Sequence, residues 1–228
     1  MKRLLATAAL RDLGATSVGL AAPYLAYMRQ DRRFQPGEAV TSKTFARLLS
    51  GAVDWMVTVD PHLHRRASMA EIYTVPVSVC HAAASISAWI KANIHRPVVI
   101  GPDSESEQWV ASVANDAGSP FTVLEKQRLG DRNVEITVRN IERWRDHRPV
   151  LVDDIISSGR TMEVAVKQLI AHGLSAPVIV GVHGIFAEDA YERLKAAGAA
   201  EVISTNAVPH VSNAIDLATL VAEPVRDL

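Results

Sequence analysis

Apolar residues along the chain fall into short β-rich runs separated by longer helical stretches. The short runs predict strands at residues 16–24, 55–60, 97–103, 121–126, 134–138, 149–154, 177–184 and 201–206. Helical spacing predicts a first amphipathic helix and further helices at residues 41–51, 80–94, 105–118, 160–173 and 187–197. Such alternation indicates an α/β fold with mainly parallel sheets flanked by helices. Residues 134–138 follow the preceding strand without room for a helix, so we expect an antiparallel flap there.

Length and composition narrow the class of protein. The 228 residues suffice for one large or two small domains, and we place a break near residues 70–80. A net charge of −1 provides no overall field for nucleic acid or an anionic membrane, and no apolar stretch approaches the roughly 20 residues that a bilayer requires. The single cysteine, Cys80, excludes an internal disulfide framework and fits the cytoplasm; we expect a buried structural thiol.

The segment VLVDDIISSGRTM, residues 150–162, carries the clearest chemical signal. Asp153 and Asp154 stand at the carboxyl end of a predicted strand, where α/β sheets bind their ligands. The turn that follows opens a helix, where backbone N–H groups and the helix dipole attract an anion. We therefore expect the carboxylates to accept hydrogen bonds from sugar hydroxyls and the turn to bind the sugar's phosphate. The proposed phosphate ligands are Ser157, Ser158, Gly159, Arg160 and Thr161.

This segment resembles the phosphoribosyl-diphosphate (PRPP) loop of phosphoribosyltransferases and PRPP synthetases. Other segments favour the synthetase (ribose-phosphate diphosphokinase) branch: an Arg-Gln-Asp-Arg run within residues 23–49, the Asp-x-His-like VDPHLHR, the Pro-Asp of GPDSESEQW, the flap-like EKQR and the C-terminal STNAVPH. The resemblance covers nearly the whole chain in the family's order. It implies two phosphoribosyltransferase-like domains, the first one incomplete, because family members carry further strands before the segment that matches residues 4–15.

The resemblance implies transfer of the diphosphoryl group of ATP to ribose 5-phosphate, with Mg²⁺ as cofactor. The implied ATP ligands are Arg29, Gln30, Asp31 and Arg32. The residues alone also permit a solvated charge run at this place.

The remaining implied site residues are a metal-binding and catalytic His62, a metal ligand Asp103, and the flap residues Lys126 and Arg128. Each has an alternative. His64 competes with His62, Asp103 could instead cap the following helix, and the two flap residues could be exposed bases in a hairpin.

The expected domains are an ATP- and Mg²⁺-binding part at residues 1–75, a PRPP-loop part at 76–210 and a C-terminal helix at 211–228 that returns to the first domain. The implied partners are ATP, ribose 5-phosphate and further copies of the chain. One departure leaves alternatives open: SESE, residues 104–107, stands where the family has small residues, and its glutamates would repel a polyphosphate. A weakly active or inactive homologue that binds ribose phosphates, or regulates a true synthetase, is the first alternative. A phosphoribosyltransferase is the second.

Overall fold

The computed structural model describes residues 2–129, 133–137 and 141–226. The chain forms two compact units. Unit 1 comprises Met1–His81 and Ala218–Leu228, and unit 2 comprises Ala82–Leu217. The chain thus leaves unit 1 once and returns to it at its end. Whether the expected domain ranges carry separate functions stays a prediction.

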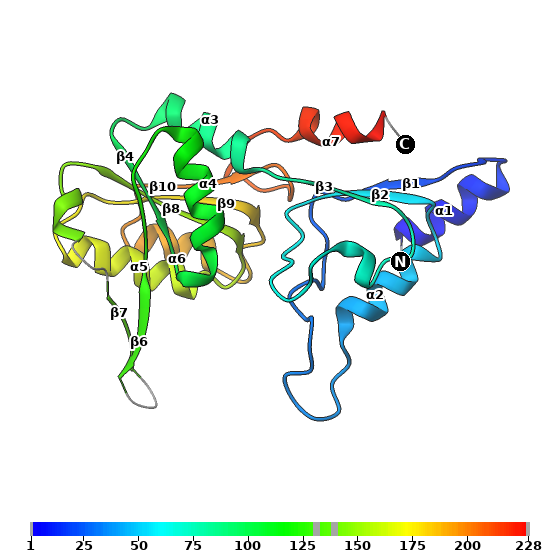
Figure 1. Cartoon of the computed structure of the whole chain (residues 1–228), viewed down its shortest axis with the longest axis horizontal. Coiled ribbons are helices and arrows are strands. Elements are labelled where there is room, and N and C mark those ends of the chain that lie inside the picture. The colour runs from blue at the N-terminus through cyan, green and yellow to red at the C-terminus, as the bar shows by residue number, and fades with distance from the viewer. Residues whose placement is uncertain (1, 130–132, 138–140, 227–228) are drawn as a thin grey trace. The chain divides into compact units, whose positions relative to one another are not determined.

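Unit 1 contains a three-stranded parallel sheet in the order β1-β2-β3 (Figure 1). Its strands are β1 (Gly19–Ala21), β2 (Trp55–Val59) and β3 (Val77–Cys80), and its helices are α1 (Lys2–Asp12), α2 (Thr41–Ser50), the short η1 (Met69–Glu71) and α7 (Ala218–Val225). Helix α7 packs against β2 and β3, and the Cys80 thiol donates to the Leu220 carbonyl oxygen at 3.4 Å. Cys80 is buried, as expected, and desolvation raises the pKa of its thiol.

The core of unit 1 lies between this sheet and α2. Ala46 and Leu49 of α2 are buried three residues apart and pack with Met56 of β2 in one apolar cluster. At the edge of the unit, Asp54 accepts two hydrogen bonds from Arg11 at 2.9 Å and one from the Val18 N–H at 2.7 Å. These bonds tie the end of α1 to the entries of β1 and β2, and they lower the pKa of Asp54.

Unit 2 contains a six-stranded parallel sheet in the order β11-β10-β9-β8-β4-β5. The strands are β4 (Pro97–Gly101), β5 (Phe121–Val123), β8 (Arg148–Ile156), β9 (Val178–Gly184), β10 (Glu201–Thr205) and β11 (Asn213–Ile215). The helices are α3 (Ala83–Asn93), η2 (Ser104–Ser106), α4 (Glu107–Ala117), η3 (Ile141–Trp144), α5 (Arg160–Ala171) and α6 (Ala190–Ala196). The expected α/β class, with two mainly parallel sheets flanked by helices, is confirmed.

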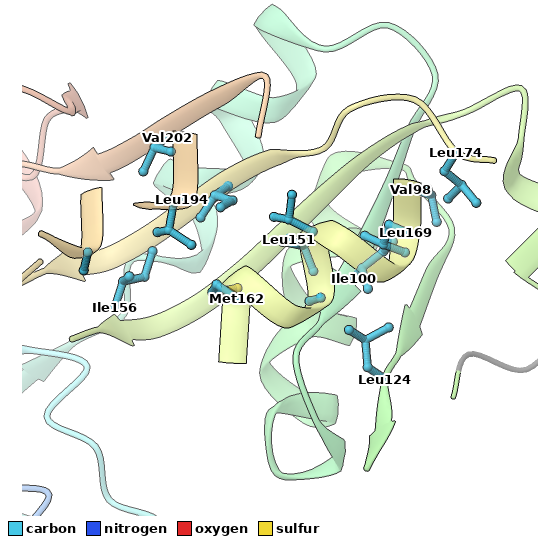
Figure 2. Close-up of a cluster of buried hydrophobic side chains, with 14 of the residues drawn as sticks. Val98, Ile100, Leu124, Leu151, Ile156, Met162, Leu169, Leu174, Leu194 and Val202 are labelled. Atoms are coloured by element: carbon cyan, nitrogen blue, oxygen red, sulfur yellow. The ribbon is translucent and has the colours of Figure 1, made fainter. Parts of the chain in front are cut away.

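The core of unit 2 explains why β8 and β9 lie at the centre of the sheet. Their apolar runs are buried almost throughout, as strands covered on both faces must be. Helix α5 places Met162, Ala165, Val166 and Leu169 toward the sheet, at helical spacing. Figure 2 shows Met162 and Leu169 in one cluster with residues of the strands and with Leu194 of α6.

The expected antiparallel flap is confirmed. Strands β6 (Glu125–Leu129) and β7 (Asn133–Thr137) pair antiparallel, with Lys126 opposite Ile136 and Arg128 opposite Val134. Figure 1 shows this hairpin extending away from the six-stranded sheet of its unit. The predicted strand 121–126 is in fact two strands, since β5 ends at Val123 and β6 begins at Glu125.

The sequence patterns do not predict the short strands β3 and β11. Strand β3 lies two residues before α3, and its last residue, Cys80, falls within the helix predicted from residue 80. Strand β11 has three residues and pairs only at the sheet edge beside β10. Such short strands carry too few alternating positions to give a periodic signal.

Among the described residues, no helix combines the length and the apolarity needed to span a bilayer.

Candidate active site

The paired acids lie in β8, near its carboxyl end. Asp153 stands opposite Gly181 of β9, and its Oδ1 atom accepts a hydrogen bond from the Asp154 N–H at 3.0 Å. Because β8 is flanked by β4 and β9, both acids stand at the middle of the sheet edge. Ligands of open parallel sheets bind at this edge.

Asp153 is held in a setting that opposes its charge. Burial raises its pKa well above the usual range of a carboxyl group, and the charges of Asp154 and Asp103 act in the same direction. Asp103 follows β4, the neighbour of β8, so the fold gathers carboxyl groups from two strands at one edge. Such a cluster favours a proton, a hydroxyl donor or a cation beside it.

The small-residue turn links β8 to α5. Gly159 has φ of 68°, a left-handed conformation that side chains rarely adopt, and it immediately precedes the first residue of the helix. Helix α5 is twelve residues long, and its first intrahelical bond runs from the Glu163 N–H to the Gly159 carbonyl at 2.8 Å. The N–H groups before Glu163 have no acceptor within the helix and are suited to an anion.

Arg193 of α6 supports this turn, and the sequence assigned it no role. Its Nη2 atom donates to the Ser158 carbonyl oxygen at 2.5 Å, and its Nη1 atom pairs with Asp189 at 2.5 Å. Its Nε atom lies 3.5 Å from Glu163 of α5. Arg193 therefore connects the turn to both helices that follow it. The sequence contains one signal for Arg193: it stands four positions after Asp189, a spacing at which two side chains of a helix can pair.

The STNAVPH segment begins with the last two residues of β10, and hydrogen bonds within unit 2 hold it in place. The Thr205 hydroxyl donates to the Val182 carbonyl at 2.7 Å, and the side-chain Oδ1 atom of Asn206 accepts from the Leu217 N–H at 2.9 Å. Asn213 donates to the Thr205 carbonyl at 2.7 Å. The Thr-Asn pair thus fastens β10 to the neighbouring strands, which places the following loop at the ligand edge of the sheet.

Asp103 lies in the loop after β4 and does not cap α4. Helix α4 begins at Glu107, with Ser106 at its cap position, and the Asp103 side chain makes no capping bond to η2. The carbonyl oxygen of Asp103 accepts from the Ser106 hydroxyl at 2.7 Å. The alternative role as cap of the long helix is therefore not observed.

In unit 1 the Arg-Gln-Asp-Arg run lies in the loop between β1 and α2. Arg29 and Arg32 are exposed. Gln30 and Asp31 instead contact their own unit: Gln30 Oε1 accepts from the Thr41 hydroxyl at 2.5 Å, and the Asp31 side chain is only 3% exposed. The guanidinium groups of Arg29 and Arg32 are therefore exposed, whereas Gln30 and Asp31 between them are held by contacts within the unit.

The Asp-x-His segment follows β2 with an uncommon backbone. Asp60 has φ of 36° and His62 has φ of 57°. A residue other than glycine in such a left-handed backbone conformation costs about 1–3 kcal/mol. The rings of His62 and His64 lie 4.0 Å apart, so geometry keeps both as candidates. Asp60 Oδ1 lies 2.9 Å from Nδ1 of His81, a contact that the sequence did not indicate.

The flap residues Lys126 and Arg128 belong to β6 by their backbone. Their side chains lie outside the part of the chain that the structure describes. Their catalytic role stays a prediction.

Unit 2 therefore brings Asp103, the paired acids and the turn to one sheet edge, and unit 1 holds the Arg-Gln-Asp-Arg and Asp-x-His segments. The individual roles of all these residues remain predictions.

Known proteins match this chain over most of its length. Residues 1–52 match the N-terminal domain of ribose phosphate pyrophosphokinase, and residues 69–219 match the phosphoribosyl transferase domain. The chain is 34% identical over 230 residues to the ribose-phosphate pyrophosphokinase of Methanopyrus kandleri, covering all of this chain and 78% of that protein. It is 35% identical over 219 residues to that of Methanothermobacter thermautotrophicus, covering 96% and 75%.

A solved structure shares the fold over almost the whole chain. The phosphoribosylpyrophosphate synthetase of Mycobacterium smegmatis superposes with a TM-score of 0.83 at 26% identity, covering 99% of this chain and 76% of that one. The chain therefore belongs to the ribose-phosphate pyrophosphokinase (PRPP synthetase) family, with a type I phosphoribosyltransferase domain.

Proposed function

We propose that this chain is a ribose-phosphate diphosphokinase that forms PRPP and AMP from ribose 5-phosphate and ATP. The anomeric hydroxyl oxygen of the sugar attacks the β-phosphorus of ATP, the bond from that phosphorus to the α-phosphate oxygen breaks, and AMP leaves. The hydroxyl proton is lost in the same overall step. Family membership supports this reaction, and the carboxyl-and-turn site on β8 and α5 is the observation that carries it.

The sugar phosphate binds at the edge of the unit 2 sheet. Asp153 and Asp154 accept hydrogen bonds from the ribose hydroxyls, which offsets the unfavourable burial of Asp153. The 5′-phosphate binds to the N-terminus of α5 through the N–H groups and hydroxyls of residues 157–161. Arg160, the first residue of α5, is exposed and adds a positive charge.

The ATP contacts lie in unit 1. Arg29 and Arg32 point outward and bind phosphate oxygens, where charge develops during transfer. Gln30 and Asp31 act as the anchored part of the same segment. Residues 1–75 are therefore the proposed ATP-binding domain and residues 76–210 the proposed ribose-phosphate domain.

The donors at these segments fit Mg²⁺. Asp103 supplies carboxylate oxygen, the ligand type that Mg²⁺ prefers, and its charge adds to a carboxyl cluster that a cation would relieve. We propose Asp103 in unit 2 and His62 in unit 1 as metal-binding residues, each within its own unit. When bound, Mg²⁺ would neutralise charge on the transferred diphosphoryl group. Lys126 and Arg128 would serve the same purpose from the flap.

AMP formation by the purified chain tests the reaction. We expect AMP from ATP, Mg²⁺ and ribose 5-phosphate, and a loss of about 10²–10³-fold in Lys126→Ala, because one transition-state cation is removed. In calorimetry, Asp154→Ala should abolish binding of ribose 5-phosphate. Unchanged affinity in that variant would refute the assignment of the β8 acids.

The loop after β4 favours one other candidate, a homologue that binds ribose phosphates without turnover. Glu107 is exposed at the first turn of α4, in the SESE segment whose glutamates would repel a polyphosphate. Binding of ribose 5-phosphate without AMP formation would support this candidate over the synthetase.

We further propose that the protein acts in the cytoplasm as a homo-oligomer. Its lone buried thiol is compatible with a reducing compartment. Light scattering of the purified chain would give its mass, and a monomer with full activity would contradict the oligomer.

A further inference from the structure

The loop that carries the Asp-x-His segment continues into two arginines, Arg65 and Arg66, for which neither the sequence nor the proposed reaction supplies a role. Both reach the Arg-Gln-Asp-Arg segment, more than thirty positions earlier in the chain. Arg65 Nη1 lies 3.3 Å from the nearer carboxylate oxygen of Asp31. Arg66 Nη2 lies 3.4 Å from the carbonyl oxygen of Asp31.

Arg66 makes its shorter contact with a buried serine. Its Nη2 atom donates to the Ser42 hydroxyl oxygen at 2.7 Å, and Ser42 is fully buried at the start of α2. That hydroxyl in turn donates to the Gln30 carbonyl oxygen at 2.9 Å, and the Ser42 N–H reaches the same oxygen at 3.3 Å. A continuous set of hydrogen bonds therefore runs from Arg66 through Ser42 to Gln30.

The contacts of Arg66 and Ser42 hold backbone carbonyl groups of the Arg-Gln-Asp-Arg segment rather than the ends of its side chains. The carbonyl groups of Gln30 and Asp31 belong to the two residues between the exposed Arg29 and Arg32. A hydrogen bond from a charged guanidinium is about twice as strong as a neutral one, and Arg66 is half-buried, which limits competition from water. Fixing these two carbonyls therefore fixes the directions in which the flanking arginines leave the loop.

We propose that Arg66 is a positioning residue for the ATP segment. It acts through Ser42 and the backbone of Gln30 and Asp31, and it holds Arg29 and Arg32 ready for the triphosphate. It also joins the two nucleotide-binding segments of unit 1, because Arg66 leaves the same loop as His62. This inference rests on the proposed function.

The test compares the variants Arg66→Ala, Arg66→Lys and Ser42→Ala with the control Arg47→Ala. Arg47 is an exposed arginine on α2, the helix that also contains Ser42. We expect Arg66→Ala to raise KM for ATP about tenfold or more, with KM for ribose 5-phosphate unchanged and kcat within a few-fold, because ground-state binding of one substrate is weakened. Arg66→Lys should recover part of this loss, since an ammonium can still reach Ser42. Arg47→Ala should match the wild type.

A double-mutant cycle tests the path through Ser42. If Arg66 acts through that hydroxyl, Arg66→Ala with Ser42→Ala should raise KM for ATP no more than the more severe single change. Hydrogen–deuterium exchange should show faster exchange in residues 28–38 of Arg66→Ala, with or without ATP. If Arg66→Ala fails to fold, Arg66→Lys and Ser42→Ala carry the same comparison.

The outcomes separate this inference from the proposed function. AMP formation by the wild type with an unchanged KM for ATP in the Arg66 variants overturns the inference alone. Equal increases in both Michaelis constants together with a lower melting temperature would assign Arg66 a merely structural role and overturn it as well. A wild-type chain that forms no AMP refutes the proposed function. Calorimetry with ATP then tests the role of Arg66 by itself. Weaker ATP binding in Arg66→Ala than in the wild type supports the inference, and equal or absent binding overturns it.

Discussion

The charge of Asp153 favours the binding of a ligand but lowers the stability of the ligand-free protein. Asp153 is half-buried near the end of β8, and the pKa of its carboxyl group is raised by desolvation and by the charges of Asp154 and Asp103. A carboxyl group with a raised pKa in the folded state stabilises the fold only while it is protonated. That contribution is fully present below the unfolded-state pKa of about 4, where the group is protonated in both states. As the pH rises from there through the folded-state pKa, ionisation lowers the free energy of unfolding.

Replacing this charge should therefore stabilise the ligand-free chain. We expect Asp153→Asn to melt at a higher temperature than the wild type at pH 7–8, by about 2–4 °C for each kcal/mol gained. The asparagine keeps an acceptor for the Asp154 N–H. The difference should shrink toward pH 4, and affinity for ribose 5-phosphate should fall. Scanning calorimetry from pH 4 to 8 checks this, and a lower melting temperature at pH 8 would contradict it.

At the scale of the element, the turn into α5 combines a backbone requirement with a binding role. Gly159 has φ of 68°, and a Cβ there would come no closer than 3.4 Å to the Leu194 side chain. Space is therefore available, and the penalty for a side chain lies in the backbone. That penalty is about 1–2 kcal/mol for an L-residue in the left-handed region.

Gly159→Ala should separate binding from strain when compared with Gly118→Ala. Gly118 caps α4 with φ of 65° and has open space around its Cβ position. Both changes should lower the melting temperature by a similar amount, about 2–8 °C. Only Gly159→Ala should weaken ribose 5-phosphate binding, about tenfold or more, because only that turn forms the phosphate site. Equal affinities in calorimetry would show that the turn is not the site.

At the scale of the whole molecule, each unit has a hydrophobic cluster of its own. Leu169 of α5 is fully buried in one, and Met56 of β2 is fully buried in the other. Truncating either side chain to alanine removes apolar contacts and leaves a cavity, at a cost of about 2–5 kcal/mol. A ligand that binds only one unit raises the stability of that unit by about 2.7 kcal/mol at a hundred times its Kd.

Ribose 5-phosphate should therefore act on one transition of two. In scanning calorimetry we expect Leu169→Ala to lower the transition that ribose 5-phosphate raises, and Met56→Ala to lower the other. The matched pair distinguishes the units because both residues are fully buried. A single transition that both substitutions lower equally would show that the chain unfolds as one cooperative unit.

The sequence alone was sufficient for features whose cause is local. The β8 strand, its paired acids, the turn and the start of α5 are consecutive, so alternation, small residues and helical spacing identify them within one short window. The α/β class follows from the same local alternation, and the antiparallel flap from the lack of room for a helix. Helix boundaries were predicted within a few residues, as for α2 and α5.

Only the tertiary structure decided which distant residues meet. The strand order β11-β10-β9-β8-β4-β5 brings Asp103 to Asp153, and no local pattern contains that order. The same holds for Arg193 at the Ser158 carbonyl and for Arg66 at Ser42, whose partners lie 35 and 24 positions away. The short strands β3 and β11 exist because a longer neighbour supplies their hydrogen bonds. Local periodicity records what a segment can form, whereas long-range packing and pairing determine what it contacts.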